Sequence, residues 1–537
     1  MITGTVLGAD GAPMKLAQVH LMTPGSALIA RAQVERDGRF ALATVRTGVF
    51  LLAFTGVNHY IASIPLVALA HTAVVVHVRL KHYAYGDSLD KVTAVGDWNH
   101  FSFQTPLALV RQPDGRYTAT VDVTADTLAY ELWGIEATGR SINGTLSDRY
   151  VYDEGGDYRS VIAAHGGHAT IVFDPAKLDR RPADTVSVTF GEPQSLEARL
   201  YALWGDWQAE RGHWQDSAVA ASKRHAQANY DWSRFLAGRG TMLNRARDPM
   251  VRQLVLEQVL DAAALGGKVD TLLARRIIRD LPASSRWWAF SDFGDPSRIE
   301  TAYRAERGDT GQAPDTSALR LTLAYVDRAV LEHPDSNVKA AALGEGVVIA
   351  QGLHDGQLAN GYFNRLVTEY PDWPDLGYFK ARYSPNRVWQ VGHDVPAFHF
   401  ASLDDSTVTY SPASFAGKVV LIDFWATWCG PCVGQMGYLQ AAHDSLAGRG
   451  LEMLSISLDK SADDVRKFRG GEWKMPWQHA FATGQWENPD LKRLEIVFIP
   501  RAALVGRDGK ILAVDEDLRG DALLPSLRRA LEATPSP

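Results

Sequence analysis

Residues 423–436 read DFWATWCGPCVGQM and contain Cys429 and Cys432, the only two cysteines of the 537-residue chain. The apolar run that begins at Lys418 is typical of a buried parallel strand, and the residues after the pair have a helical pattern that ends in glycines. The pattern therefore predicts a strand-to-helix junction with Cys429 at the helix N-terminus. Unpaired backbone N–H groups and the helix dipole favour a thiolate at that position.

The spacing of the two cysteines also predicts how they divide the chemistry. A Cys429 thiolate is the form that attacks a disulfide, and Cys432, one turn later and more buried, is placed to attack the resulting mixed disulfide. A structural zinc site needs four ligands, and the chain has neither a second cysteine pair nor a partner for His443 at metal-ligand spacing. Two inert core cysteines are the other alternative. A C-x-x-C close to a β–α–β pattern favours a redox pair, and without a third cysteine its electrons must come from another molecule.

Length and composition restrict the class of protein. A chain of 537 residues is too long for one core and predicts three or four domains. The net charge of −7 comes without a basic cluster, which argues against nucleic acid as a partner. No apolar run reaches the roughly 20 residues that cross a bilayer. The first residues lack the features of a secretory signal, so the sequence as written predicts a cytoplasmic protein, whereas removal of a signal peptide would predict a periplasmic or envelope protein.

Residues 1–180 have the two-residue alternation of strands, and the pattern predicts two β-sandwiches. Residues 1–80 resemble the carboxypeptidase-regulatory-like domain. Residues 81–180 resemble the early-set, glycogen-binding-like sandwich in the segments GDWN (96–99), DGRYTATV (114–121) and YELW (130–133). Trp98 and Trp133 could stack on sugar rings, but large aromatic side chains more often fill a core. Carbohydrate binding is therefore not predicted.

Residues 190–385 carry apolar side chains at three- and four-residue spacing, which predicts an α-helical domain. Two of the predicted helices end directly before Pro334 and Pro371, and proline after a helix is a stop signal. These two copies suggest stacked hairpins of tetratricopeptide type, although two weak copies do not establish a repeat.

The C-terminal segment, residues 390–535, resembles a known family. FAGKVVLIDFWATWC (415–429), preceded by GHDVPAFHFASLDDS (392–406), is similar to the TlpA/ResA-like branch of the thioredoxin superfamily, which is related to the AhpC/TSA proteins. This resemblance implies an α/β thioredoxin-like domain. The predicted chain is multidomain, with two N-terminal β-sandwiches, a central α-helical domain and this C-terminal domain.

The resemblance also implies catalytic residues beside the two cysteines. Asp423 matches the buried carboxylate of the family, which implies that it accepts the proton of Cys432. Burial without a cation is expected to raise its pKa toward the working range. Pro500 matches the cis-proline opposite the cysteines, and cis X–Pro bonds are retained features.

A substrate surface is implied in the same way. Trp428, Gly430 and Pro431 belong to the motif itself, and the Ile499 backbone before the cis-proline is expected to pair with an extended substrate segment. Two positions depart from the family. Gln435 stands where a glutamate is common and removes a second titrating group. Arg501 replaces a small residue and is expected to present a cation at the substrate groove.

The predicted function is a protein thiol–disulfide oxidoreductase without a cofactor or a metal. Its partners are a disulfide-containing client protein and a reductant supplied in trans. The dipeptide Gly430–Pro431 resembles that of reducing thioredoxins, which favours a reductase over an oxidase. Two alternatives stay open: a peroxiredoxin-like peroxidase that uses Thr427, and an envelope binding or scaffold protein in which the redox domain is secondary.

Overall fold

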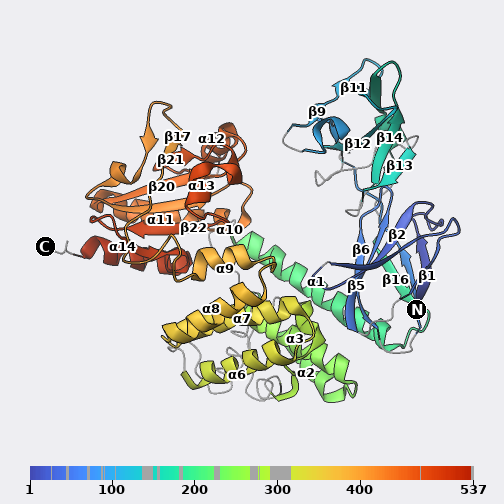
Figure 1. Ribbon diagram of the computed structural model, residues 1–537, viewed down its shortest axis with the longest axis horizontal. Coiled ribbons are helices and arrows are strands. Elements are labelled where there is room, and N and C mark those ends of the chain that lie inside the picture. Colours follow the sequence, from blue (N-terminus) through green and yellow to red (C-terminus); the bar gives the residue numbers. More distant parts are fainter. Residues whose placement is uncertain are drawn as a thin grey trace. The chain divides into compact units, whose positions relative to one another are not determined.

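The computed structural model describes residues 1–25, 27–43, 48–68, 73–85, 89, 91–102, 105–135, 149–153, 158–178, 180, 185–222, 230–266, 276, 279–290, 316–471 and 473–533 (Figure 1). The chain forms two compact units. One comprises Met1–Gln208, Thr241–Gln258 and Ser285–Ser291, and the other comprises Ala209–Gly240, Val259–Ser284 and Asp292–Pro537. In the described part of the chain, none of the helices combines the length and the hydropathy needed to span a bilayer.

The first β-sandwich consists of two four-stranded sheets with the strand orders β16-β7-β1-β4 and β3-β2-β5-β6. Its strands are β1 (Ile2–Leu7), β2 (Ala17–Met22), β3 (Leu28–Gln33), β4 (Arg39–Leu42), β5 (Gly48–Gly56), β6 (Ala62–Ala68), β7 (Val74–Arg79) and β16 (Ser187–Phe190). The strand β16 pairs antiparallel with β7 although it lies far beyond residue 80. The sequence did not predict this return, because a four-residue strand at a sheet edge carries little periodic signal.

The second β-sandwich lies in the chain between β7 and β16. Its sheets have the orders β10-β11-β15 and β13-β14-β12-β8-β9. Its strands are β8 (Thr93–Gly96), β9 (Leu107–Ala108), β10 (Val110–Arg111), β11 (Tyr117–Asp122), β12 (Thr127–Trp133), β13 (Arg149–Tyr152), β14 (Tyr158–Ala163) and β15 (His168–Phe173). Trp98 packs against the buried cluster of this sandwich, in agreement with a core role for that side chain.

The central helices confirm the predicted change from strands to helices. They are α1 (Leu196–Ser222), α2 (Ser233–Arg245), α3 (Pro249–Ala264), α6 (Thr316–Glu332), α7 (Ser336–Gly352), α8 (Gly356–Glu369) and α9 (Leu376–Tyr383). Aspartates cap two of them: Asp335 accepts from the backbone N–H groups of Asn337 and Val338 in the first turn of α7, and Asp355 accepts from that of Leu358 in the first turn of α8. Residues 270–281 of the predicted helical domain fall largely outside the described residues.

The C-terminal domain has a seven-stranded sheet with the order β18-β17-β21-β20-β19-β22-β23 (orange and red in Figure 1). Its strands are β17 (Phe400–Ser402), β18 (Thr409–Tyr410), β19 (Val419–Trp425), β20 (Leu451–Ser457), β21 (Gln478–Phe481), β22 (Arg501–Val505) and β23 (Ile511–Val514). Its helices are α10 (Gly430–Val433), α11 (Met436–Leu446), α12 (Ala462–Gly470), α13 (Pro489–Arg493) and α14 (Leu523–Glu532). Strands β19, β20 and β21 are parallel, and β22 runs antiparallel to β19.

The interior strand β19 is buried on both faces, as its continuous apolar sequence predicts. Leu421 and Trp425 belong to the core layer that contains both cysteines, α11 and α14. The alternate residues Ile422 and Phe424 belong to the opposite layer, together with α13. Because side chains alternate along a strand, Asp423 lies on the same face as Leu421 and Trp425, which is the face of the cysteines.

A substitution in the helical layer tests the packing of α9. A Cβ at Gly344 of α7 would lie 2.6 Å from the Phe379 ring of α9, and that ring is restrained by contacts with Trp373 and Tyr383. We expect Gly344→Ala to destabilise the protein by about 1–3 kcal/mol, measured by thermal unfolding. Gly361→Ala in α8 is the matched control, because nothing lies within 4 Å of its Cβ and alanine favours helix. An unchanged or raised melting temperature for Gly344→Ala would contradict this packing.

Candidate active site

The two cysteines form a disulfide at the junction between β19 and α10. Cys429 is the N-cap of α10, and its Sγ accepts a hydrogen bond from the backbone N–H of Cys432 at 3.2 Å. Cys429 is 6% exposed and Cys432 is 1% exposed, so the second sulfur is the less accessible one. Pro431 occupies the first turn of the helix, where its missing N–H costs no intrahelical hydrogen bond.

The helix that follows the cysteines is interrupted. α10 has four residues, and α11 begins at Met436 after Gly434 and Gln435, whereas the sequence predicted one helix after the cysteines. The Gln435 side chain uses its Oε1 to accept a hydrogen bond from the backbone N–H of Gly520 at 2.9 Å. The position therefore ties the helix junction to the segment before α14, a role that the sequence did not indicate.

The peptide bond between Ile499 and Pro500 is cis. In the register of β19 and β22, Phe424 lies opposite Arg501, so Pro500 comes next to the end of β19 that leads into the cysteine motif. Ile499 is half-buried and packs against both core layers of the domain. The structure thus brings the cis-proline and the dithiol to the same end of the sheet, although they are far apart in the sequence.

Asp423 is a buried carboxylate on the cysteine face of β19, and it is 8% exposed. Its neighbours across the sheet are Ser455 on β20 and Ala502 on β22. Burial raises the pKa of Asp423 to about 7, against the smaller lowering effects of the hydrogen bond with Ser455 and of the charge on Arg519. In the described part of the chain, its Oδ2 is buried without a hydrogen-bond partner. The group can therefore exchange a proton near neutral pH.

A second buried carboxylate holds the loop before Cys429. Asp459, 2% exposed, lies just beyond the end of β20. It accepts from the backbone N–H of Thr427 at 3.2 and 3.0 Å and from the Thr427 hydroxyl at 2.5 Å. Sequence reasoning did not find Asp459. The available signal was its place directly after the strand that neighbours the motif strand, because neighbouring parallel strands end at the same edge of the sheet.

The residues expected to meet a substrate differ in exposure. Trp428 is 55% exposed. Arg501 is only 2% exposed, and its guanidinium donates to the Ala381 carbonyl of α9 at 3.1 Å and lies 4.0 Å from Asp515. In this conformation Arg501 presents no cation at the surface, in contrast to the expectation from the sequence, because α9 covers it.

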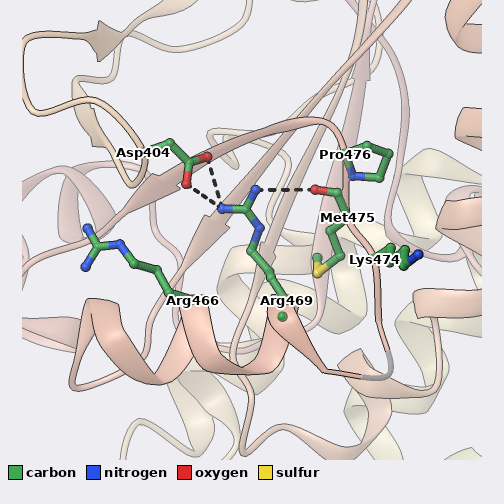
Figure 2. Close-up of a pocket in the computed structure, with 7 residues that line it drawn as sticks. Asp404, Arg466, Arg469, Lys474, Met475 and Pro476 are labelled. Atoms are coloured by element: carbon green, nitrogen blue, oxygen red, sulfur yellow. Dashed lines mark hydrogen bonds and ion pairs between the residues drawn. The ribbon is translucent and has the colours of Figure 1, made fainter.

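The described pocket of about 320 Å³ in Figure 2 lies elsewhere in the domain. Figure 2 shows Arg469 of α12 paired with both carboxylate oxygens of Asp404 and bonded to the Met475 carbonyl. Met475 precedes β21, and Cys429 follows β19. Because these strands are parallel, the pocket and the dithiol lie at opposite ends of the sheet. The arginine connects α12 to the sheet and takes no part in the candidate site.

Comparisons with known proteins agree with this geometry. Residues 390–518 match the family model described as Redoxin. The thiol-disulfide oxidoreductase ResA of Bacillus cereus is 24% identical over 156 residues, which cover 29% of this chain and 83% of that relative. ResA of Oceanobacillus iheyensis is 37% identical over 87 residues, which cover 16% of this chain and 44% of that relative.

Solved structures were also matched. The thioredoxin domain of a thiol-disulfide oxidoreductase from Bacteroides vulgatus is 28% identical, with 27% of this chain and 99% of that chain covered and a TM-score of 0.25. The C-terminal domain of a thiol-disulfide oxidoreductase from Bacteroides thetaiotaomicron is 26% identical, with 27% of this chain and 97% of that chain covered and a TM-score of 0.24.

The seven-stranded sheet with a C-x-x-C at the junction between its interior strand β19 and a helix defines a thioredoxin-like redox domain. Residues 390–518 are similar to the Redoxin family model and to the ResA proteins, in agreement with the predicted resemblance to the TlpA/ResA-like branch of the thioredoxin superfamily.

The raised pKa of Asp423 gives a pH-dependent stability. The folded protein keeps a proton on this carboxyl up to about pH 7, whereas an unfolded chain releases it near pH 4. Stability therefore falls as the pH rises between these values. Asp423→Asn cannot ionise, and we expect it to exceed the wild type in stability at pH 8 by up to about 4 kcal/mol and to equal it near pH 4.

The measurement is hydrogen exchange of the β19 amides in the oxidised full chain at both pH values. Asp464→Asn, an exposed aspartate on α12, is the matched control and should show no such pH dependence. A difference between Asp423→Asn and wild type that is equal at both pH values would contradict a raised pKa of Asp423.

Proposed function

We propose that the protein is a thiol–disulfide oxidoreductase that reduces disulfides in client proteins through Cys429 and Cys432. The observation that carries the proposal is the conjunction of the disulfide, the cis-proline and the buried Asp423 at one end of the sheet. Each of these features serves one step of dithiol exchange, and the relatives named thiol-disulfide oxidoreductase support the same chemistry.

The proposed reaction starts from the reduced pair. The Cys429 thiolate attacks one sulfur of the client disulfide, which forms a mixed disulfide and releases the first client thiolate. Cys432 transfers its proton to Asp423, and its sulfur then attacks Cys429 Sγ. The second client thiolate leaves, and the Cys429–Cys432 disulfide forms. A dithiol donor supplied in trans returns two electrons to the pair.

The proposed client surface surrounds the exposed Trp428. The half-buried Ile499 precedes the cis-proline, and we assign its backbone to pair with an extended client segment, the mode in which a strand is added to an exposed edge. Gly430 and Pro431 complete the surface beside Cys429, because both residues are exposed. Arg501 is left out of this surface since its guanidinium is buried against α9.

The direction of the reaction follows from the Gly430–Pro431 dipeptide, which is typical of reducing thioredoxins. Their potentials lie near about −270 mV, whereas a strong oxidant lies near about −120 mV, a difference of roughly 7 kcal/mol. We expect redox titration of the full chain against a glutathione or dithiothreitol buffer to give a potential close to the reducing value. A potential near that of the oxidant would reverse the assigned direction and leave the exchange chemistry intact.

A trapping experiment tests the roles of the two sulfurs. Cys432→Ser removes the resolving thiol, so we expect the variant to accumulate a mixed disulfide on Cys429 with client proteins or with glutathione. Non-reducing electrophoresis and mass spectrometry identify the adduct. Cys429→Ser is the control and should trap nothing at an appreciable rate, because the remaining sulfur is 1% exposed. Equal trapping by both variants would refute the assigned order of attack.

The peroxidase alternative receives no support from the geometry of Thr427. Its hydroxyl donates to the buried Asp459 carboxylate and is therefore not free to polarise a peroxide. We expect consumption of hydrogen peroxide by the reduced protein to be slow compared with its reduction of a protein disulfide.

We place the protein in the bacterial cell envelope. Both cysteines of the chain belong to the active pair, and a chain without any other thiol suits an oxidising compartment. Labelling of Cys429 in intact cells of the source organism with a membrane-impermeant maleimide tests this proposal, and protection until the inner membrane is opened would contradict it.

A further inference from the structure

Arg519 contacts the cis-proline loop without belonging to the cysteine motif. It lies between the short helices η7 (Asp515–Leu518) and η8 (Gly520–Ala522). Its guanidinium donates a hydrogen bond to the carbonyl of Pro500, the cis-proline. The next residue, Gly520, is bonded to Gln435 at the junction of α10 and α11. The arginine is therefore held between the cis-proline loop and the helix that carries Cys432.

The same guanidinium acts on Asp423. The Arg519 charge lowers the pKa of this carboxyl, against the larger effect of burial that raises it. The other elements packed against Asp423 contribute the Ser455 hydroxyl from β20 and Ala502 from β22. The core layer on this face of the sheet also contains both cysteines. Helices α11 and α14 contribute apolar side chains to it, namely Met436, Leu439, Leu523 and Leu527. Arg519 is thus the charged group that lowers the pKa of Asp423, while the buried Asp515 carboxylate accepts from the backbone N–H of Ala502 at 3.4 Å.

A third contact restrains the arginine. Glu516 of η7 pairs with Arg519 at 3.3 Å. The other oxygen of Glu516 pairs with Arg382 at the end of α9. The Glu516 carboxylate is therefore shared between the helix that precedes the redox domain and the arginine at the redox site.

We propose that Arg519 is a positioning residue for the exchange reaction: it holds the cis-proline carbonyl and sets the charge that Asp423 experiences, while Glu516 and Arg382 of α9 set the position of Arg519. This inference rests on the proposed dithiol chemistry. In this role Arg519 does not touch the reacting sulfurs. Its effect is exerted through Asp423, which accepts the Cys432 proton, and through the loop that faces the client.

The test separates the two halves of the exchange. Reduced full-length protein is mixed with dithiobis(nitrobenzoate). Attack by Cys429 releases the first thionitrobenzoate, and attack by Cys432 on the mixed disulfide releases the second, so that two electrons pass from the dithiol to the reagent. The rate of the second phase, followed by absorbance against pH, reports the protonation of Asp423.

Two substitutions should change this pH profile in opposite directions. Arg519→Gln removes the cation, so we expect the midpoint to move to higher pH and the second phase at pH 6 to slow by roughly three- to tenfold. Glu516→Gln removes a carboxylate beside that cation, so we expect the midpoint to move to lower pH. Arg519→Lys keeps the charge and should keep the midpoint near that of the wild type. Arg528→Gln, at an exposed position of α14, is the matched control.

A double substitution excludes a merely structural effect. In the Asp423→Asn background, Arg519→Gln should leave the pH profile of the second phase unchanged, because the group on which the charge acts is absent. Near-UV circular dichroism verifies folding, and Arg519→Lys and Glu516→Gln keep the test valid if Arg519→Gln does not fold. A shift in the same direction for Arg519→Gln and Glu516→Gln, or an unchanged profile in Arg519→Gln, would overturn the role of Arg519. Absence of a second phase in the wild type would refute the proposed exchange chemistry itself.

Discussion

The Asp423 carboxyl is buried on the face of β19 that packs against the core layer of the two cysteines, and the proposed chemistry depends on this placement. The layer is formed by β19, α11 and α14, and it excludes the water that would keep the carboxylate charged. The protein therefore keeps a group with a pKa of about 7 on the face of β19 that packs against the cysteine layer. The role proposed for Asp423 as a base depends on the same burial that costs stability above neutral pH.

Two arginines near the cis-proline stabilise different parts of this arrangement. Arg501 is buried and bonded to the Ala381 carbonyl, so it anchors α9 to the start of β22. Arg519 is bonded to the Pro500 carbonyl and acts on Asp423 by charge. The helix α9 reaches both, through Ala381 and through the pair of Arg382 with Glu516. The helical domain thus contributes contacts to the loop on which client recognition is proposed to depend.

Much of the redox domain was predictable because its signals are local. A buried strand followed by C-x-x-C and a helix predicts the junction from neighbouring residues alone, and the resemblance of the surrounding segments located Asp423 and Pro500. The residues that were missed act across the fold. Asp459 bonds to Thr427 from the next strand, and β16 returns to the first sandwich after a whole second sandwich. Neither contact produces a periodic pattern in the sequence around the residues that it joins.

The sequence by itself determined the dithiol, its place at a strand-to-helix junction and the order of domains, since these depend on the spacing of residues that are close in the chain. The tertiary structure alone decided what surrounds the sulfurs. Only the pairing of β19 with β22 brings the cis-proline to the cysteines, and only the packing of α9 turns Arg501 inward. The physical reason is that charge and burial at a site come from all the elements that meet there, and hydrophobic periodicity records which face of an element is buried without recording what covers it.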